Sequence, residues 1–452
     1  MKPFFLPPQV QNTLKTLENA GYESYVVGGC VRDMLMGIEP HDYDITTAAT
    51  PEEVKNVFAS ERLILTGEKH GTVTLLKDGM PLEITAFRCD GDYLDGRHPS
   101  SVTFTRSLEE DLKRRDLTIN AMAYSPAAGL RDLFGGREDL ANGIVRCVGD
   151  PKERYDEDAL RLLRTLRFAV RFGFSIEPET AKALHEKRDD LQKISRERVR
   201  EEMTGILMSD HILPVCIDFA DVLFAAVPEL APMKDCPQQC IFQSYDVWEH
   251  TLRTVMACPK EPVVRWAGLL HDIGKPATRR RDENGADHFY GHAEAGVRLA
   301  DSVTATLRMP KAWQDEIRML VRRHDEMFTP DDMLLLLSEI GPEKARSLVL
   351  LHVADQAAHS PLFASKANRG LQLIDAIDQL EREGACWQLS QLAVTGGDLQ
   401  AIGLSGPAVG DTLRYLLEAV VRFHVPNDHD LLLEAAKAHK ERTVDAFRAK
   451  ES

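Results

Sequence analysis

The sequence predicts an α+β protein, in which a small β-sheet with helices forms an N-terminal head and the rest of the chain is helical. Short runs rich in β-branched residues occur almost only within residues 1–145, and such runs are typical of strands. From about residue 150 onward, long amphipathic segments follow the pattern of packed helices. No apolar run approaches the roughly 18 residues that a membrane-spanning helix needs, so no membrane association is expected.

Four runs in the head predict strands, and one segment predicts a capped helix. The helix is residues 50–58, because Thr50 precedes a proline and two glutamates, an order typical of a helix start. The strand candidates are SYVVGG (24–29), GTVTLL (71–76), LEITAF (82–87) and GIVRCVG (143–149).

The helical remainder divides where its composition changes. Proline and cysteine cluster within residues 226–240, and a second change falls within residues 384–396. A chain of 452 residues is expected to form two to four domains. The predicted division is a head (1–145), a helical neck (146–230), a helical body (231–375) and a helical tail (376–452).

The net charge of −16 argues against a protein that coats nucleic acid with its whole surface. Residues 151–200 differ, with 13 Lys and Arg against 10 Asp and Glu, so a polyanionic partner is expected to contact this region. The eight cysteines are scattered, and the N-terminus lacks a charged segment followed by an apolar run. This pattern suits a reducing cytoplasm better than a disulfide framework.

Two aspartates in the head, Asp42 and Asp44, are separated by one residue. On a strand both would point to one face with Cβ atoms about 7 Å apart, and a divalent cation would remove their repulsion. Glu83, in another strand candidate, is a possible third carboxylate. Three carboxylates around Mg²⁺ suit two-metal nucleotidyl transfer. The plainer alternatives are a polar turn for the aspartates and an exposed strand position for Glu83.

A glycine pair, Gly28 and Gly29, follows the first strand candidate. Backbone N–H groups there can approach phosphate oxygens without an intervening Cβ, and Arg32 would add a fork of donors. The alternative is a tight turn without a ligand. The dinucleotide pattern G-x-G-x-x-G is not present.

The amphipathic segment 157–174 combines arginines with a carboxylate. On one helix, Asp158 and Arg161 are three residues apart and share a face. An Asp acceptor and an Arg fork can imitate the edge of a base, so protein could replace a nucleic-acid template. The alternative is a solvated arginine face beside a packed core.

Four motifs between residues 25 and 210 together resemble, in order, those of the class II tRNA nucleotidyltransferases. That family comprises the CCA-adding enzymes and related bacterial poly(A) polymerases. The motifs are GGCVRDMLMGIEPHDYDITTAATPEEV (28–54), RRDLTINAMAY (114–124), RYDEDALRLLRTLRFAVRF (154–172) and ISRERVREE (194–202).

The resemblance implies template-independent addition of CCA to the 3′ end of tRNA, with CTP and ATP as substrates. It also implies residue roles: Gly29 and Arg32 hold the triphosphate, Asp42 and Asp44 hold catalytic Mg²⁺, Arg115 binds nucleotide, Asp158 and Arg161 read the base, and Arg164 and Arg167 assist.

Residues 119–124, INAMAY, favour CCA addition over poly(A) synthesis, because bacterial poly(A) polymerases usually have NALYY at this point. Residues 89–104 resemble the loop that CC-adding enzymes have shortened, and here that loop is complete. Full CCA addition is therefore preferred. An A-adding tRNA nucleotidyltransferase or a poly(A) polymerase is the alternative.

Seven of the 15 histidines fall between residues 250 and 359, and His271 and Asp272 are adjacent in an apolar segment. Burying that pair requires a partner or a metal. The order of these residues resembles the HD phosphohydrolase domain. The resemblance implies a core metal site of His250, His271, Asp272 and Asp355, with His292 and His324 completing a second site.

Mixed His and Asp ligation suits a transition metal, namely Ni²⁺, Mn²⁺, Co²⁺, Fe²⁺ or Zn²⁺. Some CCA-adding enzymes with such a domain hydrolyse 2′,3′-cyclic phosphates or phosphomonoesters, so the same activity is expected here. The alternatives are a purely structural HD domain, or a regulator whose head only binds nucleotide. His288, His352 and His359 are expected to be bystanders.

Overall fold

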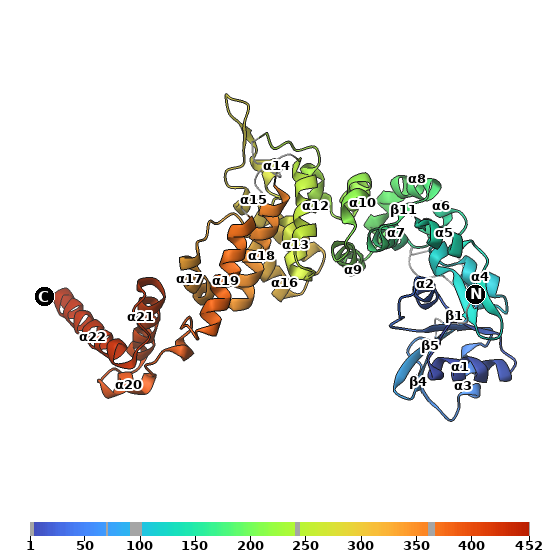
Figure 1. Cartoon of the computed structure of the whole chain (residues 1–452), viewed down its shortest axis with the longest axis horizontal. Helices are drawn as coiled ribbons and strands as arrows, with labels where there is room; N and C mark the ends of the chain where they lie inside the picture. The colour runs from blue at the N-terminus through green and yellow to red at the C-terminus, as the bar shows by residue number, and fades with distance from the viewer. Residues whose placement is uncertain (1–3, 69–70, 91–101, 240–244, 360–366, 452) are drawn as a thin grey trace. The chain divides into compact units, whose positions relative to one another are not determined.

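The computed structural model describes the chain except residues 1–3, 69–70, 91–101, 240–244, 360–366 and 452. It divides into two compact units, Met1–Pro232 with Ser302–Met309, and Met233–Asp301 with Pro310–Ser452. The predicted α+β class is confirmed, because the large sheet lies in the N-terminal part and helices dominate the rest (Figure 1).

Seven strands form the head sheet in the order β3-β4-β5-β2-β1-β8-β9. The β2–β5 pair is parallel and the other neighbours are antiparallel. The strands are β1 (Ser24–Val27), β2 (Asp44–Thr47), β3 (Arg62–Ile64), β4 (Thr72–Lys77), β5 (Met80–Ala86), β8 (Met122–Ser125) and β9 (Gly129–Asp132). A separate pair, β6 (Arg88–Asp90) and β7 (Val102–Phe104), flanks residues 91–101, so most of the expected loop 89–104 lies outside the described residues.

Helices cover both faces of the sheet. Apolar residues of α1 and α3 pack with one set of alternating strand residues, and those of α4 pack with the other set. The predicted capped helix forms as α3, where Thr50 and Glu53 make a capping box. The head helices are α1 (Pro8–Asn19), α2 (Gly29–Leu35), α3 (Pro51–Val57), α4 (Leu108–Lys113), η2 (Thr118–Asn120) and α5 (Gly136–Asn142).

The helices that follow differ from the prediction in two places. The strand expected at residues 143–149 is short, and pairs in parallel with a later strand instead of joining the head sheet. The segment 157–174 is not one helix, because α6 ends at Glu157 and α7 begins at Leu160. The elements are β10 (Ile144–Val145), α6 (Pro151–Glu157), α7 (Leu160–Phe172), β11 (Ser175–Ile176), α8 (Pro178–Lys187), η3 (Arg188–Lys193), α9 (Arg196–Leu207), α10 (Ile212–Asp218), α11 (Ala220–Ala226) and η4 (Pro228–Met233).

The second unit consists of helices with one short hairpin, β12 (Arg280–Arg281) and β13 (Asp287–His288). Its helices are α12 (Val247–Ala257), α13 (Pro262–Leu270), α14 (Lys275–Thr278), α15 (His292–Thr306), α16 (Lys311–Arg323), η5 (Pro330–Asp332), α17 (Met333–Ile340), α18 (Pro342–Ala358), α19 (Ala367–Arg382), η7 (Leu389–Gln391), α20 (Gly396–Ala401), α21 (Pro407–Phe423) and α22 (His429–Glu451). The helices α20 to α22 have an apolar cluster of their own.

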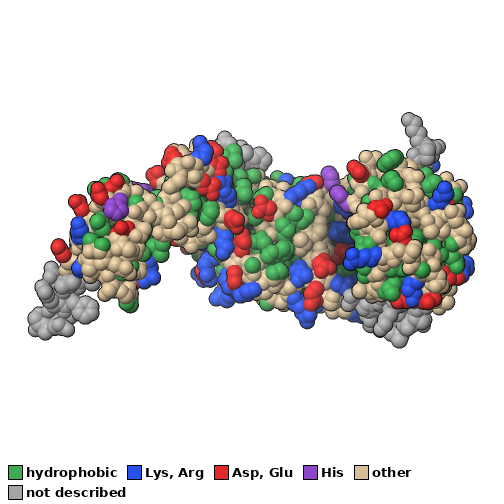
Figure 2. All heavy atoms as spheres, turned by 90° about the horizontal axis from the view of Figure 1, so that it is seen from below, with side chains coloured by type: hydrophobic (Ala, Val, Ile, Leu, Met, Phe, Trp, Pro, Cys, Tyr) green, Lys and Arg blue, Asp and Glu red, His purple; other side chains and the backbone are tan. Residues whose placement is uncertain are grey.

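The described surface mixes charges of both signs. On the face drawn in Figure 2, Lys and Arg side chains are interspersed with Asp and Glu side chains. No described helix is long and apolar enough to cross a bilayer. The seven cysteines in the described part of the chain are free thiols.

Candidate functional site

The head carboxylates lie on neighbouring strands at one edge of the parallel pair. Asp44 is the first residue of β2, and its partner across the β2–β5 register is Glu83. Adjacent strands are about 4.8 Å apart. Asp42 comes just before β2, and since Tyr43 is buried while both aspartates are exposed, the strand alternation extends back to Asp42. The two aspartates therefore share the face on which Glu83 lies.

The electrostatics of this edge fit a cation. The pKa of Asp44 is raised above its ordinary value, first by desolvation and then by the negative charges of Glu83 and Asp42, while Arg115 opposes the shift. A divalent ion would remove this penalty, and carboxylate oxygens are ligands that Mg²⁺ prefers. The three carboxylates do not lie as close together as the two His/Asp groups below, the only described sets of three ligand atoms all within 4.8 Å of one another.

The glycine pair forms the turn from β1 into α2. Gly28 has φ of +78°, a conformation that favours glycine, and a Cβ there would lie 3.2 Å from the Arg115 guanidinium. Its N–H donates to the Met122 carbonyl across 3.1 Å. Arg32 is in the first turn of α2, and a Cβ on Gly29 would lie 3.5 Å from its guanidinium. The turn thus places Gly29, Arg32 and Arg115 together.

Arg32 is only 3% exposed, and its guanidinium is held by polar partners that the sequence did not indicate. It donates to Asp33 Oδ1 at 2.7 Å and to Asn120 Oδ1 at 2.5 Å. Asn120 in turn donates to Asp116 at 3.3 Å, and Arg164 donates to Asp116 at 2.8 Å. A chain of hydrogen bonds therefore links Arg32 on α2 to Arg164 on α7.

The two expected base-reading residues do not share a continuous helix. Asp158 is extended, with φ of −146°, because its carboxylate accepts the Leu160 N–H at 3.0 Å and starts α7. Arg161 lies in the first turn of α7 and pairs with Glu157. Arg198 of α9 donates to both oxygens of Asp158, at 2.7 and 3.4 Å. Both residues thus sit at the α6–α7 junction, each already paired with protein.

The two assisting arginines are anchored by carboxylates. Arg167 donates to Glu202 of α9 at 2.5 Å, and Arg164 pairs with Asp116. Burial opposes ionisation of Asp116, but Arg164 and Arg161 outweigh it and hold its pKa at about 2. The arginine face of α7 is therefore a paired network and not a freely solvated surface.

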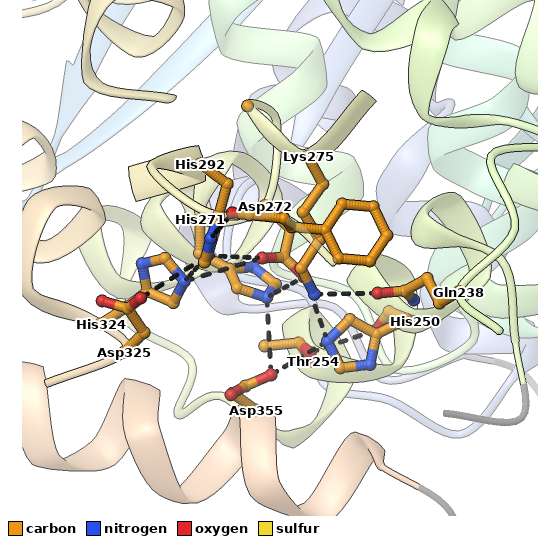
Figure 3. Close-up of polar contacts among 12 residues, drawn as sticks. Gln238, His250, Thr254, His271, Asp272, Lys275, His292, His324, Asp325 and Asp355 are labelled. Atoms are coloured by element: carbon orange, nitrogen blue, oxygen red, sulfur yellow. Dashed lines mark hydrogen bonds and ion pairs between the residues drawn. The ribbon is translucent and has the colours of Figure 1, made fainter. Parts of the chain in front are cut away.

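The second candidate site is a cluster of histidines and aspartates in the helical unit (Figure 3). One group consists of His250 on α12, His271 at the end of α13 and Asp355 on α18. Asp355 Oδ1 lies 2.9 Å from His250 Nε2 and 3.6 Å from His271 Nε2. These three ligand atoms come from three different helices.

A second group consists of Asp272, His292 and His324. Asp272 Oδ1 lies 3.6 Å from Nε2 of each of these histidines, while its Oδ2 lies 3.2 Å from His271 Nε2. The Asp272 carboxylate therefore faces both groups. His292 Nε2 and His324 Nε2 are 3.2 Å apart (Figure 3).

Three of the histidines are oriented by backbone carbonyls. The Nδ1–H of His271 donates to Gly268, that of His292 to Phe289, and that of His324 to Val321, at 2.8 to 2.9 Å. Each Nε2 lone pair is thereby directed into the cluster, which is how metal-binding histidines are commonly held. His271 Nε2 is buried and makes no hydrogen bond within the described residues. The donor set fits one or two divalent metal ions.

The charges also fit a bound cation. Burial disfavours a charged His271, but Asp272 and Asp355 outweigh it and raise its pKa to about 10. The pKa of Asp272 and that of Asp355 are both lowered, because neighbouring cationic groups outweigh the effect of burial. The cluster therefore favours positive charge, which a divalent metal supplies.

Two residues of the cluster were missed or set aside on sequence grounds. Lys275 donates to Gln238 at 2.8 Å, and its Nζ lies 2.6 Å from Asp272 Oδ2. His359 stacks on His250 with centroids 5.4 Å apart and lies 3.7 Å from Asp355. The signal for His359 was its spacing, because Asp355 and His359 are four residues apart on one helix face.

The other two expected bystanders lie differently. His288 pairs with Asp282 on the exposed hairpin, and His352 lies against the His324 backbone carbonyl at 3.2 Å. Neither belongs to the two ligand groups found among the described residues.

Four protein-family models match the chain in succession. They are the Poly A polymerase head domain at residues 24–146, the probable RNA- and SrmB-binding site of polymerase A at 173–231, the HD domain at 247–383 and the putative tRNA nucleotidyltransferase domain 2 at 357–436.

Whole-chain comparisons agree with these models. A CCA-adding enzyme of Leuconostoc mesenteroides is 50% identical over 431 residues, covering 95% of this chain and 96% of that relative. A CCA-adding enzyme of Lactiplantibacillus plantarum is 35% identical and covers 94% of each chain. The crystal structure of the Bacillus stearothermophilus CCA-adding enzyme in complex with CTP has a TM-score of 0.72 at 28% identity, covering 97% of this chain and all of that one.

Proposed function

This chain belongs to the family of CCA-adding enzymes, which are tRNA nucleotidyltransferases, and we propose how its own residues add C, C and A to tRNA from CTP and ATP. The observation that carries the proposal is the juxtaposition of Asp44 and Glu83 across the β2–β5 pair. The family membership that the sequence motifs predicted is confirmed.

In the head, the 3′-hydroxyl of tRNA attacks the α-phosphate of the nucleotide, and pyrophosphate leaves. Asp42, Asp44 and Glu83 would hold Mg²⁺, which supplies positive charge for the phosphates and lowers the pKa of the attacking hydroxyl. Gly29 and Arg32 bind the triphosphate through backbone and guanidinium N–H groups, with Arg115 beside them. These roles are supported by the raised pKa of Asp44 and by the burial of Arg32.

Asp158 and Arg161 select the base, with Arg164 and Arg167 supporting them from α7. An Asp acceptor and an Arg donor fork match hydrogen-bonding groups on a base edge. Because Asp158 is bound by Arg198 and Arg161 by Glu157, we infer that these protein partners orient the two side chains for an incoming base. tRNA is held through its phosphates and shape by the local positive charge of residues 151–200.

The test uses a tRNA transcript that lacks its 3′ end, incubated with Mg²⁺ and with CTP, ATP or both. Growth that stops at CCA, with ATP used only after CTP, is the expected result. If the protein extends only a tRNA that already ends in CC, and only with ATP, it is instead an A-adding enzyme. A long A ladder on any RNA would identify a poly(A) polymerase.

We propose a second activity for the HD-matching segment, namely metal-dependent hydrolysis of a phosphoester such as a 2′,3′-cyclic phosphate. The support is the pair of ligand groups that share Asp272. A transition metal among Ni²⁺, Mn²⁺, Co²⁺, Fe²⁺ and Zn²⁺ suits these His and Asp ligands. Hydrolysis by wild-type protein that is lost in His271→Ala and Asp272→Ala supports the activity; equal hydrolysis by all three would overturn it.

We keep the division into head (1–145), neck (146–230), HD body (231–375) and tail (376–452) as a proposal for how these activities are distributed. It is supported by the succession of family models along the chain. Limited proteolysis that cuts preferentially near residues 230 and 380 is the expected result.

A further inference from the structure

Two phenylalanine rings on α7 form a platform beneath several guanidinium groups. The rings of Phe168 and Phe172 stack with centroids 6.1 Å apart and planes 17° from parallel. The Arg32 guanidinium carbon lies 5.2 Å from the Phe168 centroid and 5.0 Å from the Phe172 centroid. Arg167 and Arg164 also lie over Phe168, at 4.7 and 5.6 Å.

The platform joins two parts of the nucleotide site. Arg32 belongs to α2, directly after the glycine turn, whereas Phe168 belongs to the helix that begins beside Asp158. The hydrogen-bond chain through Asn120 and Asp116 joins Arg32 to Arg164 a second time. Arg32 and Arg164 are thus fixed relative to each other by an aromatic contact and by a polar route.

The geometry leaves only the edges of the Arg32 guanidinium for a ligand. The guanidinium lies over the two rings, and its N–H donors point outward to Asp33 and Asn120. A phosphate is bound best by such in-plane donors. A triphosphate would compete with Asp33 for them, while the rings keep the plane from tilting.

We propose that Phe168 and Phe172 are positioning residues for the triphosphate, acting through Arg32 and keeping it in register with the base-reading end of α7. The inference rests on the proposed nucleotidyl transfer and deepens it. Cation–π contacts of desolvated arginines contribute up to about 2 kcal/mol, and Arg32 is almost fully buried. Both rings contact Arg32, but only Phe168 also contacts Arg164 and Arg167. Phe172 therefore reports on the phosphates without the arginines that support base selection.

A plain core role for Phe168, which is 5% exposed, makes a different prediction. Loss of core packing lowers the free energy of unfolding and would weaken all nucleotides alike. Loss of a positioning contact to Arg32 weakens the binding of a nucleotide with three phosphates more than that of a nucleotide with one. Comparing CTP with CMP separates the two roles.

The experiment measures the Kd of CTP and of CMP, together with kcat and KM for CTP, in the full chain with Phe168→Leu or Phe172→Leu. The matched control is Phe174→Leu, because Phe174 packs on Phe172 at 5.4 Å but lies under no guanidinium among the described residues. We expect Phe172→Leu to weaken CTP by about 5- to 30-fold, with CMP within twofold and the control unchanged. Phe168→Leu should weaken CTP at least as much.

Equal weakening of CTP and CMP in Phe172→Leu, or no change in either, would overturn the inference. Should Phe168→Leu fail to fold, the half-buried Phe172 provides the same test through its own contact with Arg32. Failure of wild-type protein to extend tRNA with CTP would overturn the proposed function instead, and that outcome is seen without any variant.

Discussion

Asp44 and Glu83 are direct neighbours across the parallel β2–β5 pair, although 38 residues of sequence separate them. The arrangement sets two carboxylates about one strand spacing apart, and the charge of Glu83 helps to raise the pKa of Asp44. Within a folded head, this repulsion persists unless a cation is bound.

Replacing Asp44 therefore separates folding from activity. Asp44→Asn should lower nucleotidyl transfer by roughly a thousandfold, because a metal ligand is lost, while the thermal midpoint stays the same or rises as the repulsion is relieved. Single-turnover extension of tRNA and thermal unfolding are the two measurements. Asp78→Asn, on an exposed turn of the head, is the control. Full transfer by Asp44→Asn would contradict the assigned role.

Arg198 is expected to orient Asp158 for base selection. Arg198→Met should raise the KM for CTP by about tenfold and reduce discrimination against UTP, because two hydrogen bonds to a charged group are lost. Steady-state incorporation of each nucleotide into one tRNA measures this. Arg196→Met is the matched control, since Arg196 lies on the same helix and bonds instead to Gln192 and the Ala226 carbonyl. Unchanged selectivity in both variants would exclude Arg198 from base selection.

Asp116 makes the fold sensitive to acid. Its pKa of about 2 in the folded chain lies below the roughly 3.9 of an unfolded aspartate. The stabilisation, about 2.6 kcal/mol, is therefore complete above about pH 5 and is lost as the pH falls through 4 toward 2. The free energies of unfolding in urea of wild type and Asp116→Asn should differ at pH 7, and the difference should disappear in acid. Asp189→Asn is an exposed control and should unfold with the same free energy as wild type. A difference between wild type and Asp116→Asn that persists at pH 2 would contradict the assignment.

The two sites should be separable by mutation. His271→Ala removes a ligand from the helical cluster, so the metal content after dialysis should fall while CCA addition by the head stays within twofold of wild type. Elemental analysis and the tRNA extension assay measure these in one preparation. His288→Ala is the control, because His288 pairs with Asp282 on the hairpin. A wild-type metal content in His271→Ala would rule out the cluster as the metal site.

Chelation should leave the helical unit folded. Backbone carbonyls hold His271, His292 and His324, so the far-UV circular dichroism at 25 °C should change by less than about 5% when metal is removed. The thermal midpoint should still fall, because an ion that binds only the native state stabilises it by mass action. Unfolding at 25 °C on chelation would show that the ligands are assembled by the metal.

The sequence was a good guide wherever a feature is local. The capped helix at residues 51–57, the β1 turn and the spacing of Asp42 and Asp44 are all set by neighbouring residues. The pairing of the strand within residues 143–149 was not predicted, because its partner, Ser175–Ile176, comes later in the chain and pairs in parallel. Asp158 was placed inside a helix because the periodicity on either side of it is continuous, whereas its own carboxylate caps α7.

Partners brought together by the fold could not be predicted. Arg198 reaches Asp158 across 40 residues, and the Phe168 platform meets Arg32 from a different part of the chain. The periodicity of α7 marks Phe168 only as a core residue. Asn120 and Asp116 were visible within RRDLTIN, but their link to Arg32 depends on how η2 lies beside α2.

The backbone bonds of the three histidines have a consequence for the choice of metal. Each ring is oriented by the backbone carbonyl three residues before it. His271 and His324 lie at the ends of α13 and α16, and His292 is the first residue of α15. A site whose ligands are aimed by the backbone accepts any ion that suits those ligands, and imidazole and carboxylate together satisfy most first-row divalent ions. Occupancy then follows the supply of each ion, so the same chain should work with different metals in cells grown on different trace elements.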